Sequence, residues 1–429
     1  IRAARAWQDA RQAAERFGGP EVVTGATAGG DAGFAAAMER MRRIRADISH
    51  HDSADRFSSL GVDMFLGQGR FTGPETAEVG GVTLRFRRAV VATGARAAAP
   101  PIPGLEEAGY LTNETVFALT ERPRRLAVVG AGPIGCELAQ SFARLGCEVT
   151  LFDMADHALV REDADAAERV QKAMVADGVK MELGVDVERV SRDGGVVTVA
   201  FSRDGAKGEV EADEILIAVG RAPNVDGLGL EAAGVRYDEK KGVEVDDQLR
   251  TTNPKIYAAG DVSSQYKFTH VADAEARIVI QNALFFGRKK ASDLLVPWCT
   301  YTSPEIAHVG MYEKDAKEKG IEVETLTVPL DTVDRALLDG EDAGFLRLHL
   351  KKGKDEILGA TLVSEHAGET ISELALAMTA GIGLGTIAGV IHPYPTQAEV
   401  IKKAADQWRR GKLTPFVKKV FEWWFKVFG

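Results

Sequence analysis

The chain has 429 residues, of which 45% are hydrophobic, and 53 basic against 63 acidic side chains give it a net charge of −10. This length supports two to four domains, and because no basic cluster offsets the negative charge, we do not expect nucleic-acid binding. Three widely spaced cysteines (Cys136, Cys147 and Cys299) argue against a disulfide framework and predict a reducing, cytoplasmic location. No apolar run has the length of a membrane span.

The first part of the chain predicts helices followed by short strands. Residues 1–60 alternate helical patterns, beginning with Ile1–Phe17, around a glycine-rich break at Gly25–Gly33. Because the chain opens on Ile1 in helix-like sequence, without a methionine, we expect it to be part of a longer protein. The expected strands are Asp63–Leu66, Gly69–Thr72, Glu78–Val79, Thr83–Phe86 and Ala89–Ala92.

A glycine motif at residues 126–137, Leu-Ala-Val-Val-Gly-Ala-Gly-Pro-Ile-Gly-Cys-Glu, follows an apolar strand and opens a helix expected over Cys136–Leu145. Gly130 allows the tight turn, Gly132 lets the backbone approach a pyrophosphate, and Gly135 lets the helix pack closely on the sheet. The pyrophosphate would sit on free N–H groups at the helix start. The motif therefore predicts a dinucleotide site, with Pro133 and Ile134 as further members of the loop.

An acidic residue ends the next predicted strand, Glu148–Phe152. Asp153 lies about 20 residues beyond the glycines, where a carboxylate binds the ribose 2′-hydroxyl. No arginine follows it directly, so the sequence favours NADH over NADPH.

Three other apolar strands end in small or polar residues, at Thr93-Gly94, at Gly220 and at Gly260-Asp261. Ligands of open α/β sheets bind at the carboxyl edge of the strands. The Asp261 carboxylate would suit a polyol hydroxyl, such as the ribityl chain of a flavin. Together these strand ends predict a second nucleotide site.

The pattern changes after Pro297, where strands precede helices, as in an α+β domain attached to an α/β body. The expected strands are Glu305–Gly310, Glu322–Val328, Gly344–Leu350 and Ile357–Val363, and the expected helices are Val271–Phe286 before them and Glu369–Ala380 and Thr396–Arg410 after them.

The order of these motifs, closed by Tyr301-Thr-Ser-Pro-Glu-Ile-Ala-His-Val-Gly310, resembles the pyridine nucleotide–disulfide oxidoreductases, and its mercuric-reductase-like branch most closely. The resemblance covers the whole chain. It implies an α/β fold with two Rossmann-like domains, the flavin domain split and N-terminally truncated, and a C-terminal α+β domain that forms a homodimer. The implied domains are flavin-binding (1–118 and 239–293), nicotinamide-binding (119–238) and dimerisation (294–429).

The family carries a flavin-pyrophosphate glycine loop and a redox-active Cys-x4-Cys, with a lysine just after it, near its N-terminus, and these motifs do not occur here. We therefore expect the chain to begin just past the catalytic disulfide. The resemblance implies that Glu137 lies at the hydride-transfer site, without its lysine partner, and that His270 belongs to a segment beneath the flavin ring. The three cysteines are expected to be small buried apolar residues.

Residues 392–399, His-Pro-Tyr-Pro-Thr-Gln-Ala-Glu, resemble the family's acid–base motif, with Tyr394 in the place of the histidine and Glu399 as the residue that orients it. A phenol is a poor base near neutrality, because its pKa is about 10. Mercuric reductases resemble the chain in this tyrosine, which can help to hold a metal ion. His392 would face the same side in an extended segment and could partly substitute for the histidine; the alternative is that it packs near the dimer interface.

The resemblance predicts a flavoprotein that passes hydride from NAD(P)H, with NADH favoured, to FAD and then to a disulfide, thiol or metal-ion acceptor in the intact protein. We predict no resident metal site. The alternatives are an NADH–flavin diaphorase or oxidase without disulfide chemistry, or an inactive nucleotide-binding fragment. The tail Thr414–Phe428 mixes lysines with aromatic residues; packing on its own domain is favoured over peripheral contact with a membrane surface.

Overall fold

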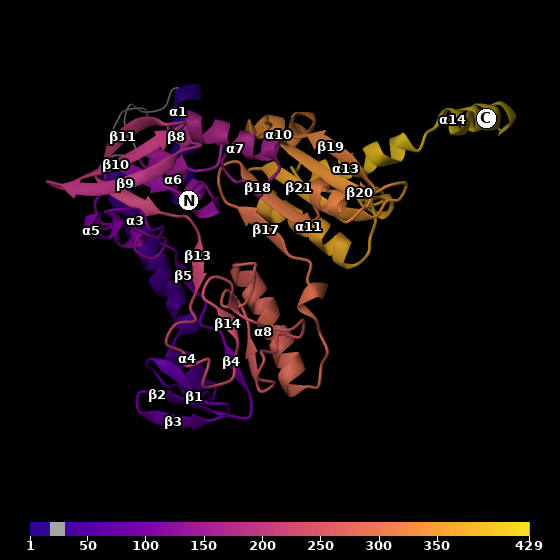
Figure 1. The fold of residues 1–429 in the computed structure, drawn as a ribbon. Coiled ribbons are helices and arrows are strands. Elements are labelled where there is room, and N and C mark those ends of the chain that lie inside the picture. The colour runs from indigo at the N-terminus through magenta and orange to yellow at the C-terminus, as the bar shows by residue number, and fades with distance from the viewer. Residues whose placement is uncertain (18–30, 429) are drawn as a thin grey trace.

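The computed structural model describes residues 1–17 and 31–428, so most of the expected glycine-rich break lies outside the described residues. Two long helices and a short one come first, followed by a three-stranded antiparallel sheet in the order β1-β2-β3, drawn at the bottom of Figure 1. The expected strand Asp63–Leu66 is wrong, because this stretch has no partner strand among the described residues and Leu66 stays 77% exposed. The elements are α1 (Arg2–Phe17), α3 (Asp31–Ser49), α4 (Ala54–Ser59), β1 (Gly69–Gly73), β2 (Thr76–Val79) and β3 (Val82–Arg85).

A four-stranded parallel sheet in the order β12-β6-β7-β8 forms the centre of the next part. Strand β6, one of the two inner strands, is mostly apolar and almost entirely buried, as expected for a strand covered on both faces. Helix α6 begins at Pro133, three residues before its expected start. The elements are β6 (Arg125–Val129), α6 (Pro133–Arg144), β7 (Glu148–Asp153), α7 (Ala164–Ala176), β8 (Lys180–Leu183) and β12 (Glu214–Ile217), with the antiparallel sheet β9 (Asp186–Asp193), β10 (Val196–Arg203) and β11 (Ala206–Ala212).

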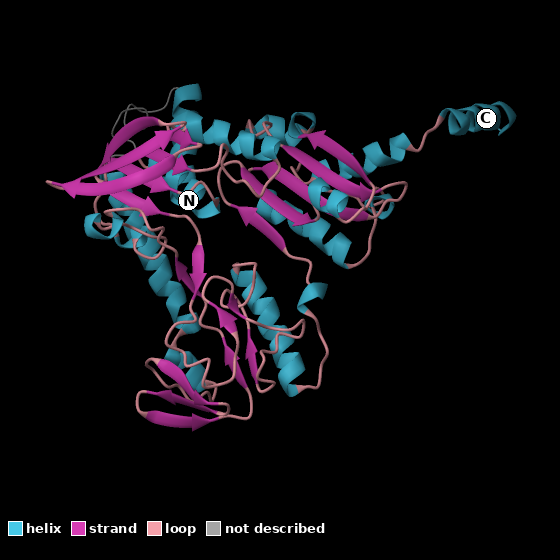
Figure 2. Ribbon diagram, viewed as in Figure 1, coloured by secondary structure: helices cyan, strands magenta, loops and turns pink. Residues whose placement is uncertain are grey.

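Short strand pairs join segments that are far apart in the sequence. Strand β4 pairs with β16 in parallel, and β5 pairs with β13 in antiparallel fashion. Figure 2 shows one long helix, α8, alongside these strands. The elements are β4 (Ala89–Val91), β5 (Ala95–Ala97), α5 (Leu105–Ala108), β13 (Arg221–Pro223), β14 (Tyr237–Asp238), β15 (Gly242–Val243), β16 (Ile256–Ala258) and α8 (Thr269–Leu284).

The C-terminal part is the expected α+β unit, a five-stranded antiparallel sheet in the order β17-β18-β21-β20-β19. Helix α11 packs on it through buried residues that include Ile371 and Leu374. The strands are β17 (Pro297–Thr300), β18 (Glu305–Gly310), β19 (Val323–Pro329), β20 (Phe345–Lys351) and β21 (Ile357–Ser364), and the helices are α9 (Glu313–Glu318), α10 (Asp334–Asp339), α11 (Ala367–Thr379), α12 (Leu384–Ile387), α13 (Glu399–Gly411) and α14 (Pro415–Phe428).

The last helix departs from expectation. Helix α14 projects away from the C-terminal sheet (Figure 1), and none of its residues is buried by the described chain. The expected packing of the tail on its own domain is therefore wrong. Across the described residues, no helix is both long enough and apolar enough to cross a membrane.

The largest apolar core contains residues from the first helices, the parallel sheet and the C-terminal sheet. It joins Leu126 and Phe142 of the parallel sheet and α6 with Phe34 of α3 and with Phe345 of β20. The rings of Phe34 and Phe142 lie 5.7 Å apart between centroids. The first helices and the C-terminal sheet thus help to fix the position of α6.

Candidate active site

The three glycines of the predicted dinucleotide loop have three different surroundings. A Cβ on Gly130, whose φ is +108°, would lie 2.6 Å from the Ala218 carbonyl oxygen, and a Cβ on Gly135 would lie 1.8 Å from the carbonyl oxygen of Gly130. At Gly132, no described atom lies within 4 Å of that position. The loop is therefore closed where it meets the sheet and open at Gly132, which leaves room for a pyrophosphate.

The start of α6 suits an anion. Gly132 is the N-cap residue, so no side chain covers the helix start, and Pro133 occupies the first turn without an N–H of its own. The first-turn N–H groups of Ile134 and Gly135 lie at the positive end of the helix dipole. A dinucleotide pyrophosphate fits both the space and the donors.

Asp153 makes two backbone contacts that the sequence did not predict. Its Oδ2 accepts a hydrogen bond from the Ala131 N–H at 2.5 Å, and its Oδ1 accepts one from the Ala155 N–H at 2.8 Å. The carboxylate at the end of β7 therefore ties down the glycine loop, and each oxygen keeps a lone pair for a ribose hydroxyl.

The strand ends predicted for the flavin come together. The Thr93 hydroxyl donates to the Asn224 carbonyl at 2.7 Å, and the Asn224 N–H donates to the Gly94 carbonyl at 2.9 Å. Gly94 and Gly220 both have positive φ, and no described atom occupies the position of a Cβ on either. These two glycines can thus let a flat ligand approach the backbone closely.

The Asp261 carboxylate forms an ion pair with Arg221, which also donates to the Ala95 carbonyl at 2.8 Å. The sequence predicted Asp261 as a polyol acceptor and missed this cation, although Arg221 belongs to a quoted motif. The Arg221 Nε is buried without a partner among the described residues. Gly260 donates its N–H to Glu275 at 2.7 Å, and burial raises the pKa of Glu275. A polar ligand at this edge would meet both a carboxylate and a guanidinium.

His270 lies in the first turn of α8, and no side-chain hydrogen bond from the described residues caps this helix start. Its Nε2 donates to the Pro297 carbonyl at 2.8 Å, and its ring stacks on Phe268 at 5.3 Å. The uncapped N–H groups can stabilise negative charge on a ligand, as expected for a helix start near a flavin.

Glu137 connects the glycine helix with the C-terminal sheet. Its Oε1 accepts a hydrogen bond from the Tyr301 N–H at 2.8 Å. Burial raises the pKa of Glu137, and this hydrogen bond opposes the rise. The other carboxylate oxygen of Glu137, Oε2, remains available to a ligand.

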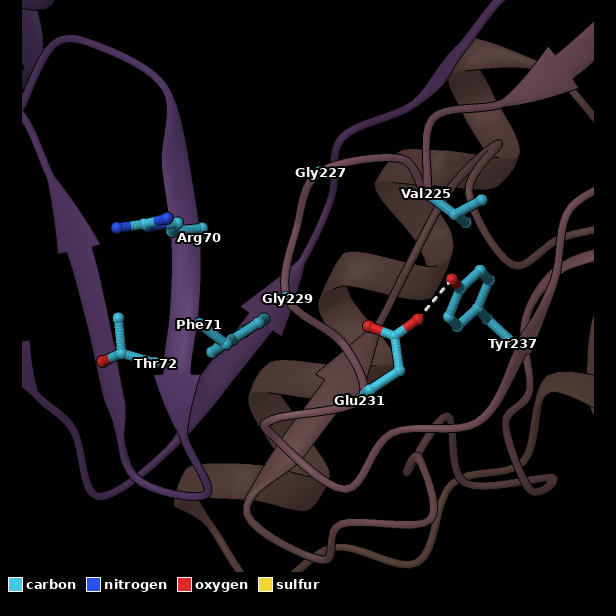
Figure 3. Close-up of a pocket in the computed structure, with 8 residues that line it drawn as sticks. All are labelled: Arg70, Phe71, Thr72, Val225, Gly227, Gly229, Glu231 and Tyr237. Atoms are coloured by element: carbon cyan, nitrogen blue, oxygen red, sulfur yellow. Dashed lines mark hydrogen bonds between the residues drawn. The ribbon is translucent and has the colours of Figure 1, made fainter.

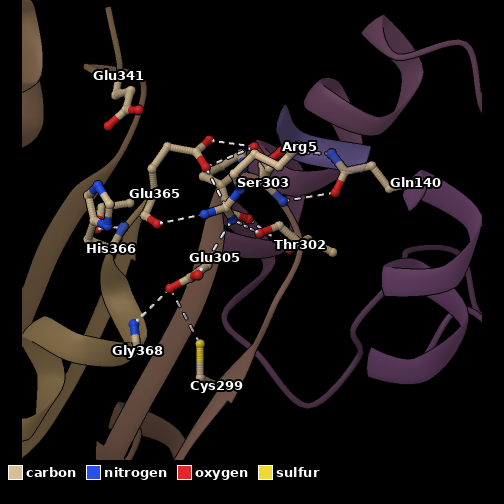
Figure 4. Close-up of polar contacts among 12 residues, drawn as sticks. Arg5, Gln140, Cys299, Thr302, Ser303, Glu305, Glu341, Glu365, His366 and Gly368 are labelled. Carbon is tan, nitrogen blue, oxygen red and sulfur yellow. Dashed lines mark hydrogen bonds and ion pairs between the residues drawn. The ribbon is translucent and has the colours of Figure 1, made fainter. Parts of the chain in front are cut away.

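A polar cluster beside Glu137 was not predicted (Figure 4). Arg5 forms ion pairs with Glu305 at 3.5 Å and Glu365 at 3.3 Å and donates to the Thr302 carbonyl at 3.1 Å. Glu305 also accepts the Gly368 N–H at 2.9 Å, while the Ser303 hydroxyl donates to Glu365 at 2.7 Å. The cluster joins α1 to the C-terminal domain; its one sequence signal was the Pro-Glu of the motif at residues 301–310.

The predicted acid–base residues lie in the C-terminal domain, but their partners differ from those expected. The Tyr394 hydroxyl donates to Asp334 at 2.8 Å, and this hydrogen bond raises the pKa of Tyr394. His392 bonds through its Nε2 to Glu373 at 2.9 Å. Glu399 pairs with Lys403 at 3.5 Å, and its Oε2 is buried without a partner among the described residues. The residue that orients Tyr394 here is Asp334.

The remaining candidates are a cavity and the three cysteines. A cavity of about 530 Å³ between β1 and residues 225–237 is lined by none of the predicted site residues (Figure 3). Cys136 and Cys147 are buried and Cys299 is half-buried, and burial raises the thiol pKa of all three, that of Cys147 to about 12. No metal-ligating cluster occurs in the described part of the chain.

Residues 16–276 match the family model described as pyridine nucleotide-disulphide oxidoreductase, and residues 296–405 match the model of its dimerisation domain. The chain belongs to the pyridine nucleotide-disulphide oxidoreductase family. These matches confirm the family resemblance that was inferred from the order of the motifs. They also confirm the predicted α/β class with a C-terminal dimerisation domain. Members of the family use FAD together with NAD(P)H.

Similar proteins include the mercuric reductase of Lysinibacillus sphaericus, 36% identical over 88% of this chain and 69% of its own length. The mercuric reductase of Bacillus cereus is 37% identical over 88% of this chain and 60% of its own length. The dihydrolipoyl dehydrogenase of Thermus scotoductus is 35% identical over 80% of this chain and 75% of its own length. The chain thus spans only part of the length of these relatives.

Solved structures agree on the fold. LpdA from Mycobacterium tuberculosis is similar over 95% of this chain and 88% of its own chain, with a TM-score of 0.83 and 27% identity. The Cu(II) complex of the HOCl-induced flavoprotein disulfide reductase RclA from Escherichia coli is similar over 88% of this chain and 86% of its own, with a TM-score of 0.81 and 29% identity.

Proposed function

We propose that the intact protein oxidises NADH, reduces a bound FAD and passes the electrons to a disulfide, a thiol or a metal ion. The observation that carries this proposal is the arrangement around α6, where an open glycine loop and Glu137 lie on one helix and Tyr301 meets that helix from the C-terminal domain. The mercuric reductases among the similar proteins favour mercuric ion as the acceptor.

In this proposal, the residues of the chain bind and orient the nicotinamide nucleotide and the flavin, while the flavin, when bound, accepts and releases the electrons. The N–H groups at the start of α6 hold the pyrophosphate, and Asp153 holds the ribose. Glu137 is held by the Tyr301 N–H, so its free oxygen can fix the position of the nicotinamide. Arg221 and Asp261, which form an ion pair, would lie at the edge of the flavin.

The test is anaerobic addition of NADH to the FAD-loaded intact protein. The visible flavin absorbance should bleach, and Glu137→Gln should slow this step by about tenfold or more, because the nicotinamide loses an orienting charge. Glu148→Gln, on an exposed carboxylate at the start of β7, is the matched control and should react normally. Failure of NADH to bleach the flavin would refute the proposal, while an unaffected Glu137→Gln would remove Glu137 from the site.

Asp153 gives a test of nucleotide preference. Replacing it with alanine should weaken NADH binding about tenfold, since the ribose loses a hydrogen bond, the glycine loop loses its bond from Ala131, and the segment after β7 loses its bond from Ala155. The preference for NADH over NADPH should disappear. Asp153→Asn retains one acceptor oxygen and should fall between the two proteins. If titration of both nucleotides shows an unchanged preference, the assignment of Asp153 is wrong.

We further propose a cytoplasmic homodimer. The dimerisation-domain match supports the dimer, as do exposed apolar residues in that domain, including Leu338 at 75% and Ile391 at 94% exposure. The three free cysteines fit a reducing compartment. In such a dimer, Tyr394, His392 and Glu399 would serve the acid–base step of the partner's site.

A further inference from the structure

Helix α14 separates its residues into two faces. At 100° per residue, its charged residues fall on one narrow strip, and its aromatic and valine side chains cover the rest of the circumference. The apolar residues are exposed, with Phe416 at 74%, Trp423 at 59% and Phe425 at 66%. The charged strip consists of Lys418, Lys419, Glu422 and Lys426.

The described chain leaves this apolar face uncovered. The hydrogen bonds that link α14 to preceding residues are those of its own start, from the Val417 and Lys418 N–H groups to Thr414. The exposed aromatic rings of α14 contact one another only within the helix, as in the tilted pair Trp424 and Phe428, whose ring centroids lie 4.5 Å apart. An apolar surface of this kind requires an occupant from outside the described residues.

The charge of the segment indicates which occupant it is. Residues 409–426 contain six lysines and arginines and one glutamate, in a chain whose net charge is −10. Basic residues therefore gather beside the exposed aromatic residues of α14, and Trp423 borders the lysine strip. Lysines on the polar face with Trp and Phe on the other are the pattern of a helix that lies in a membrane interface.

We propose that α14 docks on an anionic lipid surface, lying parallel to it with its Phe and Trp side chains inserted and its lysines among the lipid headgroups. The helix has 14 residues, which is too short to span a bilayer. A lipid surface can cover an apolar face that extends over more than half of the helix circumference, and its anionic headgroups can also neutralise the lysines. The rest of the protein, which is acidic, would be held facing away from the lipid.

Co-sedimentation of the purified protein with vesicles tests this proposal. Vesicles of phosphatidylcholine with about a third phosphatidylglycerol should bind the protein, and pure phosphatidylcholine should bind it at least tenfold more weakly. Trp423→Glu with Trp424→Glu should reduce binding by about a hundredfold, because the inserted face is lost. Lys418→Glu with Lys419→Glu should reduce binding to anionic vesicles by about twentyfold or more.

The matched control is Lys240→Glu with Lys241→Glu, an exposed pair on another part of the surface, which should bind like the unchanged protein. All of these positions are exposed, so thermal unfolding should change little. Absence of binding to anionic vesicles, or unchanged binding of the tryptophan variant, would overturn the proposal. If the tryptophan variant instead lowers the molar mass in solution without lipid, a second copy of the chain covers α14 and the lipid proposal is wrong. None of these readouts depends on electron transfer.

Discussion

Gly135→Ala is expected to lower the free energy of unfolding by about 3 kcal/mol and to abolish detectable NADH binding. The new Cβ would lie 1.8 Å from the Gly130 carbonyl oxygen, which is backbone and cannot rotate away. Either α6 or the loop must move, and the pyrophosphate site moves with it. Chemical denaturation and NADH titration measure the two effects.

Gly132→Ala is the matched control, two residues away on the same loop. Gly132 has an extended backbone with φ −74°, and no described atom lies within 4 Å of the new Cβ. The stability should therefore change by less than about 1 kcal/mol, while the methyl group enters the space proposed for the pyrophosphate and weakens NADH binding about tenfold or more. If both variants lose stability equally, the space at Gly132 is not open, and if Gly132→Ala binds NADH normally, that space is not a ligand site.

Arg5→Met is expected to cost about 3–5 kcal/mol of stability at neutral pH, because it leaves Glu305 and Glu365 without their shared cation. Both carboxylates are largely buried, with side chains 8% and 16% exposed. Adding Glu305→Gln and Glu365→Gln to Arg5→Met should restore most of the loss, since the neutral amides can still accept hydrogen bonds from Gly368 and Ser303. No recovery in the triple variant would show that Arg5 acts through packing instead.

The cost of Arg5→Met should also depend on pH. Burial raises the pKa of Glu305 and of Glu365, and the Arg5 charge opposes both rises. In the unfolded chain these carboxyls titrate near their ordinary value of about 4.3. The folded state therefore holds more protons, so stability falls as pH increases from the ordinary pKa through the raised one. Removing Arg5 raises the folded pKa values further, so the variant should lose more stability at pH 7–8 than near pH 4.

The glycine loop and the helix that follows it could be predicted because their residues lie in one continuous stretch. Gly130, Gly132 and Gly135 have the spacing and the surroundings that the motif implied. The strand ends at Thr93, Gly220 and Asp261 were also recognisable, since each closes an apolar run.

Contacts between distant segments could not be predicted in the same way. Arg5 meets Glu305 across 300 positions of the chain, and Tyr394 meets Asp334 across 60. Local patterns carry no information on such pairs, because they arise only when helices and sheets pack. The tail was misjudged for the same reason, since its amphipathic pattern does not say what covers its apolar face.

The shared apolar core around α6 has a consequence for recombination between related proteins. Phe34 from the first helices and Phe345 from the C-terminal sheet pack in the same core as Phe142 of α6. A chimera that exchanged residues 119–238 alone would therefore place foreign side chains against native ones on two sides. A viable exchange has to carry the α3 and β20 contact residues with it, so segments far apart in the gene are expected to change together.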